Sequence, residues 1–93
     1  MSDAPNAATF TPYIGATASL PDGHTLSLVA VDQRAQGGAL RAPFSLLMRG
    51  AATPVVPEGL HRLEFPNGAS FELYLIPVHT PSREHQDYQI VFN

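Results

Sequence analysis

The sequence predicts an all-β fold: a single small antiparallel β-sandwich or barrel of about six strands. No window of eleven or more residues carries apolar side chains at the period of a helix. Several short stretches instead alternate between apolar and polar residues with a period of two, and turn-forming residues separate them. Closing or stacking such a sheet also protects its edges, which favours a sandwich or a barrel over an open sheet.

The length of 93 residues corresponds to one domain. Residues 1–8 are small and polar, and we expect them to be a disordered N-terminal lead-in. Residues 9–93 then form the single β domain. Apolar residues make up 44% of the chain, which is enough for one compact core and argues against disorder throughout.

A short segment that closes one end of the core is expected before the first hairpin. Phe10 and Tyr13 are three residues apart, which suits a short helical turn at one end of the core. Residues 16–20 and 24–31 are the first two strands. Residues 21–23 between them read Pro-Asp-Gly, in which the glycine takes the left-handed position of a bulged hairpin turn.

The central stretch, residues 41–50, is the most apolar part of the chain. Its alternation directs Phe44, Leu46 and Met48 to one face and Ser45, Leu47 and Arg49 to the other, as in a strand. We expect the segments before and after this strand to pair on either side of it. Residues 32–40 and 50–59 are predicted loops, because the first contains a Gly-Gly pair and the second two prolines.

A second hairpin repeats the chemistry of the first. Residues 60–65 and 71–78 alternate as strands, and residues 66–68 between them read Pro-Asn-Gly. A last strand covers residues 87–92, with its aromatic and aliphatic residues on one side.

Composition excludes several classes of function. There is no cysteine, so disulfides and thiolate metal sites are excluded, and the four histidines lack the spacing of a zinc site, so we expect no metal and no cofactor. Five arginines lie singly among eight acids, which argues against a nucleic-acid partner. No nucleophile elbow or phosphate-binding loop is present, so we expect no enzyme activity. No signal peptide or membrane-spanning run occurs, which predicts a soluble protein that is cytoplasmic at synthesis and has no membrane partner.

The outward face of the predicted strands carries apolar residues where a one-sided sheet should be polar. An exposed apolar patch on a soluble domain typically marks a partner surface, and an arginine at its rim suits an interface. The predicted partner-binding residues are Leu47, Tyr74, Ile76, Val91 and Arg49. The alternative is that the strands twist so that some of these residues close one end of a barrel.

Five motifs across the chain resemble an uncharacterised family of small bacterial proteins. They read FxPxIG at 10–15, RxPFSLLxRG at 41–50, PxGxxxLExP at 57–66, ELxLxP at 72–77 and YxxVFN at 88–93. The chain departs from that pattern at residues 16–19, Ala-Thr-Ala-Ser, where a large aromatic residue is usual. The family brings no established activity and no catalytic residues. Its members are often encoded beside phage-tail-collar-like proteins, which implies a role in a tail-like or filamentous assembly.

Two functions are therefore expected. The first is a non-catalytic protein-binding or assembly module, either a structural component or an accessory chaperone of a phage-tail-like or filamentous assembly. Its partner would be a tail-collar-like protein or a second copy of the chain, and its final location an exported assembly. The second is a small-ligand or carbohydrate-binding β domain whose site is formed by the 32–40 and 50–59 loops.

Overall fold

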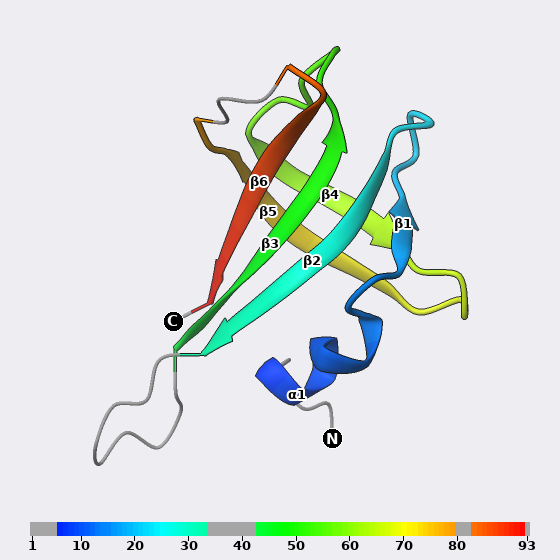
Figure 1. The fold of residues 1–93 in the computed structure, drawn as a ribbon. Helices are drawn as coiled ribbons and strands as arrows, with labels where there is room; N and C mark the ends of the chain where they lie inside the picture. The colour runs from blue at the N-terminus through cyan, green and yellow to red at the C-terminus, as the bar shows by residue number, and fades with distance from the viewer. Residues whose placement is uncertain (1–5, 34–42, 80–82, 93) are drawn as a thin grey trace.

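The computed structural model describes residues 6–33, 43–79 and 83–92. Six antiparallel strands close into a small barrel, which confirms the predicted fold class and decides between its two forms (Figure 1). A short helix and a 3₁₀ turn precede the strands. The elements are α1 (Ala7–Phe10), η1 (Thr11–Tyr13), β1 (Thr17–Ser19), β2 (Thr25–Gln33), β3 (Phe44–Ala51), β4 (Gly59–Glu64), β5 (Ser70–Pro77) and β6 (His85–Phe92).

The order of strands around the barrel is β1-β2-β3-β6-β5-β4. The central strand β3 pairs with the preceding strand β2, as expected. Its other neighbour is the last strand, β6, and not the next strand along the chain. The strand β4, which we expected there, pairs instead with β5 and, through Ser19 and Glu64, with β1, so the barrel closes between the two hairpins.

The two predicted hairpin turns are equivalent in detail. Leu20 N–H donates to the His24 carbonyl in the first turn, and Phe65 N–H donates to the Ala69 carbonyl in the second, both at 2.8 Å. Gly23 and Gly68 adopt φ angles of 96° and 91°, the left-handed conformation that glycine adopts without steric cost. In both turns the side chain at the middle position also accepts a hydrogen bond from the backbone N–H two residues later, a standard Asx turn.

Inward-facing side chains of all six strands fill the barrel. Phe44, Leu46 and Met48 of β3 are buried, as their alternation predicts. Tyr88 of β6 is almost fully buried, and its hydroxyl accepts a hydrogen bond of 2.8 Å from Val56 N–H. Val56 belongs to the connection between β3 and β4, whose residues 52–58 form no strand, as the two prolines predict. This bond fixes the connection to the core. The predicted 50–59 loop is too long, because Gly50 and Ala51 belong to β3 and Gly59 to β4.

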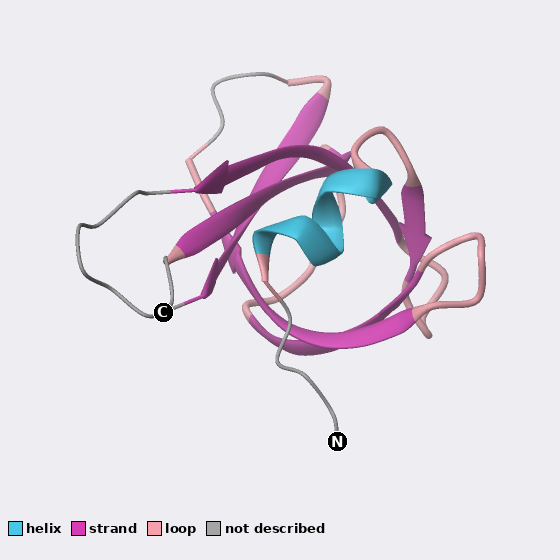
Figure 2. Ribbon diagram, turned by 90° about the horizontal axis from the view of Figure 1, so that it is seen from below, coloured by secondary structure: helices cyan, strands magenta, loops and turns pink. Residues whose placement is uncertain are grey.

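The α1–η1 segment covers one mouth of the barrel, which confirms the predicted plug (Figure 2). Phe10 is fully buried, with its ring centroid 5.0 Å from that of Phe71 and 5.5 Å from that of Phe92. Regular structure begins earlier than the predicted boundary at residue 9. Asn6 caps α1, because its side chain accepts a hydrogen bond from Thr9 N–H, and Ala7 is buried. Residues 1–5 of the predicted lead-in lie outside the described residues.

Candidate functional site

The five predicted partner-binding residues all lie on the outside of the barrel. Tyr74 and Val91 are about half exposed, at 50% and 48%, and Arg49 is also exposed. Leu47 and Ile76 are partly buried. The period-two alternation therefore placed every one of these side chains on the correct face.

Leu47 and Ile76 lie in one row across three strands. Leu47 of β3 pairs with Ala30 of β2 on one side and with Gln89 of β6 on the other, and Gln89 pairs with Ile76 of β5. Residues of paired strands at the same register share a face of the sheet. The row Ala30–Leu47–Gln89–Ile76 thus has three apolar side chains and one amide side chain, that of Gln89.

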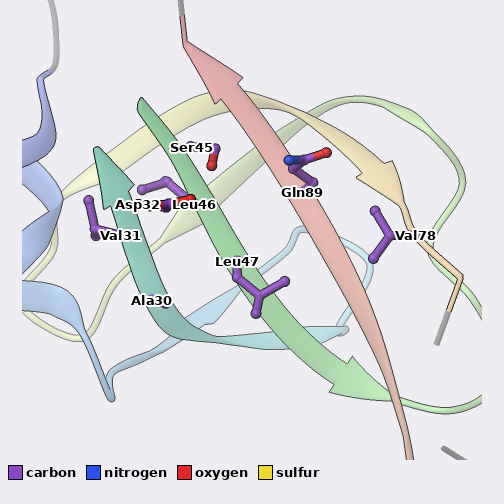
Figure 3. Close-up of a pocket in the computed structure, with 8 residues that line it drawn as sticks. All are labelled: Ala30, Val31, Asp32, Ser45, Leu46, Leu47, Val78 and Gln89. Carbon is purple, nitrogen blue, oxygen red and sulfur yellow. The ribbon is translucent and has the colours of Figure 1, made fainter. Parts of the chain in front are cut away.

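Three residues of this row, Ala30, Leu47 and Gln89, line an open hollow of about 480 Å³ (Figure 3). Its polar side chains are those of Asp32, Ser45 and Gln89. The other lining residues are apolar: Ala30, Val31, Leu46, Leu47 and Val78. Among the described residues of the predicted 32–40 loop, Asp32 lines the hollow and Gln33 does not. Asp32 and Gln33 belong to strand β2, and residues 34–40 lie outside the described residues. No residue of the 50–59 loop lines it, so the hollow does not join the two loops predicted for a small ligand.

The β5–β6 divergence is the point at which these two strands stop pairing. Their pairing consists of Ile76 with Gln89 and Pro77 with Tyr88. At the next position with the same orientation, Tyr74 and Val91 would face each other, but they are not paired. Beyond that point, β5 and β6 run in different directions (Figure 1). Tyr74 and Val91, two predicted residues, therefore flank the place where the pairing of β5 and β6 ends.

Tyr74 has its own surroundings on the outer face of β4 and β5. It pairs with Leu60, which is 62% exposed, and its hydroxyl donates a 3.0 Å hydrogen bond to Glu58 Oε2. This bond to a carboxylate raises the pKa of the Tyr74 phenol, because ionising it would place two negative charges together. Leu60 was missing from the predicted set. It lies two residues before the outward-facing Arg62, so the alternation of that strand contains the signal for it.

Arg49 is already engaged within the chain. Its Nε donates to Asp87 Oδ1 at 2.8 Å and its second nitrogen lies 3.3 Å from Asp87 Oδ2, and the two residues are cross-strand partners on β3 and β6. Hydrogen bonding to the Arg49 guanidinium lowers the pKa of the Asp87 carboxyl, and the same bond raises the pKa of Arg49. Arg49 therefore contributes a neutralised pair to the rim and not a free positive charge.

Two of the described histidines lie beside aspartates. Among the described residues, no group of three or more His, Asp or Glu side chains has the arrangement of a metal site. His24 pairs with Asp22 in the first turn, and His85 Nε2 lies 3.6 Å from Asp87 Oδ1 at the start of β6. The backbone N–H of His24 donates to the carboxylate of Asp22 and lowers its pKa, and the His24 side chain adds to that shift.

One protein family matches almost the entire chain. Its model, described as a domain of unknown function (DUF6916), covers residues 5–92. Neither the curated proteins nor the solved structures give a significant match to the chain. No helix in the described part of the chain has the length and apolar character needed to span a membrane.

Proposed function

The chain belongs to the family of the domain of unknown function DUF6916, and we propose that it is a non-catalytic protein-binding module that acts in an assembly. The binding surface is the outer surface around the β5–β6 divergence. It consists of the five predicted residues together with Leu60, the neighbour that sequence reasoning missed. The full set is Leu47, Arg49, Leu60, Tyr74, Ile76 and Val91, with Arg49 at the rim in its ion pair with Asp87.

The observation that carries this proposal is the exposure of Tyr74 and Val91 on the segments of β5 and β6 that do not pair with each other. Both side chains are about half exposed. Tyrosine is enriched in protein interfaces because its ring supplies apolar area and its hydroxyl a hydrogen bond. Apolar area removed from water contributes about 25 cal/mol per Å². Burial of these two side chains against a partner would therefore contribute favourably to the free energy of binding.

The partner and the location follow from the resemblance described above. Members of the similar family are often encoded beside phage-tail-collar-like proteins, so the proposed partner is such a protein. The module is then either a structural component of a tail-like or filamentous assembly or its accessory chaperone. A structural component would leave the cytoplasm with the exported assembly, whereas a chaperone would stay behind.

The test is the effect of Tyr74→Glu on complex formation. The protein is co-expressed with a phage-tail-collar-like protein, and sedimentation velocity across a dilution series of the complex gives the affinity. Truncating a central aromatic anchor costs about 2 kcal/mol or more, so we expect at least roughly a thirtyfold loss of affinity. Thr25→Glu is the matched control, because Thr25 is also an exposed strand residue but lies on β2, away from this surface.

The melting temperature separates loss of binding from loss of folding. The melting temperature of Tyr74→Glu should lie within a few degrees of that of the wild type, because the Tyr74 side chain points away from the core. Equal affinity of the wild type and Tyr74→Glu for the partner, or absence of any complex, would exclude this surface as the binding site.

A further inference from the structure

We propose that the free edge of β5, from Ser70 to Tyr74, is a strand-addition site for an extended segment of the partner protein. That segment carries an apolar residue opposite Tyr74 and a lysine or arginine opposite Glu72. The inference rests on the proposed function and specifies the partner's conformation and side-chain pattern.

The hairpin fixes the direction in which the backbone of β5 points. Phe65 N–H donates to the Ala69 carbonyl, so residues 65 and 69 form a hydrogen-bonded pair. Hydrogen-bonded and non-hydrogen-bonded pairs alternate along an antiparallel ladder. The pairs Glu64–Ser70, Arg62–Glu72 and Leu60–Tyr74 are consequently non-hydrogen-bonded. In such pairs the backbone N–H and C=O groups point away from the partner strand. Ser70, Glu72 and Tyr74 thus direct these groups away from β4, toward the other edge of β5.

No strand in the described part of the chain takes up those groups. The pairing of β5 with β6 begins only at Ile76, after Tyr74. None of the backbone hydrogen bonds outside the strand ladders involves Glu72 or Tyr74. An exposed strand edge of this kind offers donors and acceptors at the correct spacing for one more strand, and added strands gain affinity from main-chain hydrogen bonds.

The side chains beside this edge define what the added strand carries. Tyr74 is about half exposed, and Val91 lies across the divergence from it, so an apolar residue fits opposite Tyr74. Two positions away on the same face, Glu72 is exposed and makes no ion pair within the described chain. The outer face of β4 and β5 holds two carboxylates, Glu64 and Glu72, and one guanidinium, Arg62. Glu58, just before β4, adds a third carboxylate through its hydrogen bond with Tyr74, so the net charge of this surface is −2. Arg62 makes its hydrogen bond with Ser70 Oγ, at 3.4 Å.

Charge favours a different protein over a second copy of this chain. The chain has a net charge of −3, and two copies joined by the same edge bring two faces of charge −2 together. In such a pairing Glu72 meets Ser70, Glu72 or Tyr74 of the other copy, and none of these supplies the missing positive charge. Like charges across an interface are unfavourable, whereas complementary charges give specificity.

The probe is a set of end-blocked seven-residue peptides added to the intact protein. The first alternates threonine with valine and lysine, so that valine and lysine occupy successive positions on one face. The second replaces the lysine with glutamate, and the third has proline at the central position, which removes a backbone donor. Amide hydrogen exchange followed by NMR gives the protection of each residue, and titration gives the affinity.

We expect the first peptide to slow exchange of the Glu72 and Tyr74 amides and to leave the β2 amide of Ser27, which is already within the sheet, unchanged. The glutamate peptide should bind at least roughly threefold more weakly, and the proline peptide should give no protection. Glu72→Lys should reverse the order of the lysine and glutamate peptides. This reversal cannot arise from loss of folding, since an unfolded variant binds neither peptide selectively.

Three results would overturn the inference: no binding by the first peptide, binding without protection of Glu72 and Tyr74, or equal binding of the lysine and proline peptides. They are distinct from failure of the proposed function. If the native partner binds in a manner sensitive to Tyr74→Glu but leaves exchange at Glu72 and Tyr74 unchanged, the binding surface stands and the strand-addition mode is wrong.

Discussion

Strand β6 has two neighbours, and it pairs with them unequally. Toward β3 it pairs at eight positions, from Phe44–Phe92 to Ala51–His85. Toward β5 it pairs at two, after which the strands diverge. The side toward β3 is continuous sheet, so it belongs to the stability of the fold. The side toward β5 leaves Val91 and Tyr74 exposed, and we assign it to binding.

Deletion of residues 90–93 should have the largest effect on the stability of the β3 side of β6. Deleting them removes Ile90 from the core and three of the eight pairs of the β3–β6 ladder, including the stack of Phe92 on Phe44 at 4.4 Å. We expect the truncated protein to lose cooperative unfolding in urea. An unchanged midpoint and slope would show that the end of β6 contributes nothing to the fold.

Phe44→Ala tests the same side through one side chain. Phe44 is buried, and its ring lies 6.1 Å from that of Phe10, so truncation leaves a cavity at the plugged mouth of the barrel. We expect a loss of about 3–5 kcal/mol in the free energy of unfolding. The matched control is Leu60→Ala at an exposed site, which should change stability little. A melting temperature of Phe44→Ala close to wild type would contradict the central position of this strand.

Tyr88→Phe is expected to have a smaller effect. The variant keeps the buried ring but removes the acceptor for Val56 N–H. A buried donor that loses its partner costs about 1–3 kcal/mol. Chemical denaturation measures the loss, and a change within error would indicate that water replaces the hydroxyl.

Acid should produce the smallest change. The folded-state pKa values of Asp22 and Asp87 are lowered, by His24 and by Arg49 respectively, from an ordinary value of 3.8. The unfolded state therefore binds protons first, so the stabilisation is complete above pH 3.8 and is lost as the pH falls through the lowered values. We expect Asp87→Asn to flatten this acid limb in a series of unfolding curves. An identical pH dependence of stability in the variant would show that Asp87 does not contribute to the acid sensitivity of the fold.

The sequence predicted the local structure well because local structure depends on local chemistry. The Pro-Asp-Gly and Pro-Asn-Gly turns specified both hairpins, and alternation specified the faces of Leu47, Tyr74 and Val91. Long-range pairing carries no such signal. Nothing near β3 indicates that β6 is its second neighbour, because that choice depends on how the whole sheet closes.

The candidate site shows the same limit. Alternation identified the outward apolar residues. The point at which β5 and β6 stop pairing depends on the course of both strands together, so the sequence of either strand alone does not encode it. The Arg49–Asp87 pair and the Tyr74–Glu58 hydrogen bond likewise join separate segments. The sequence therefore indicated which side chains face outward, and the structure shows which backbone groups are left beside them.

Amide hydrogen exchange, with and without the proposed collar-like partner, tests the contrast between the two sides of β6 most directly. In the isolated protein, the amide of Ile90, which points toward β3, should exchange slowly, and those of Val91 and Tyr74 should exchange rapidly. Adding the partner should slow exchange at Tyr74 and leave Ile90 unchanged. Equal protection of Ile90, Val91 and Tyr74 in the isolated protein, or no change at Tyr74 on binding, would contradict the assignment of this edge to a partner.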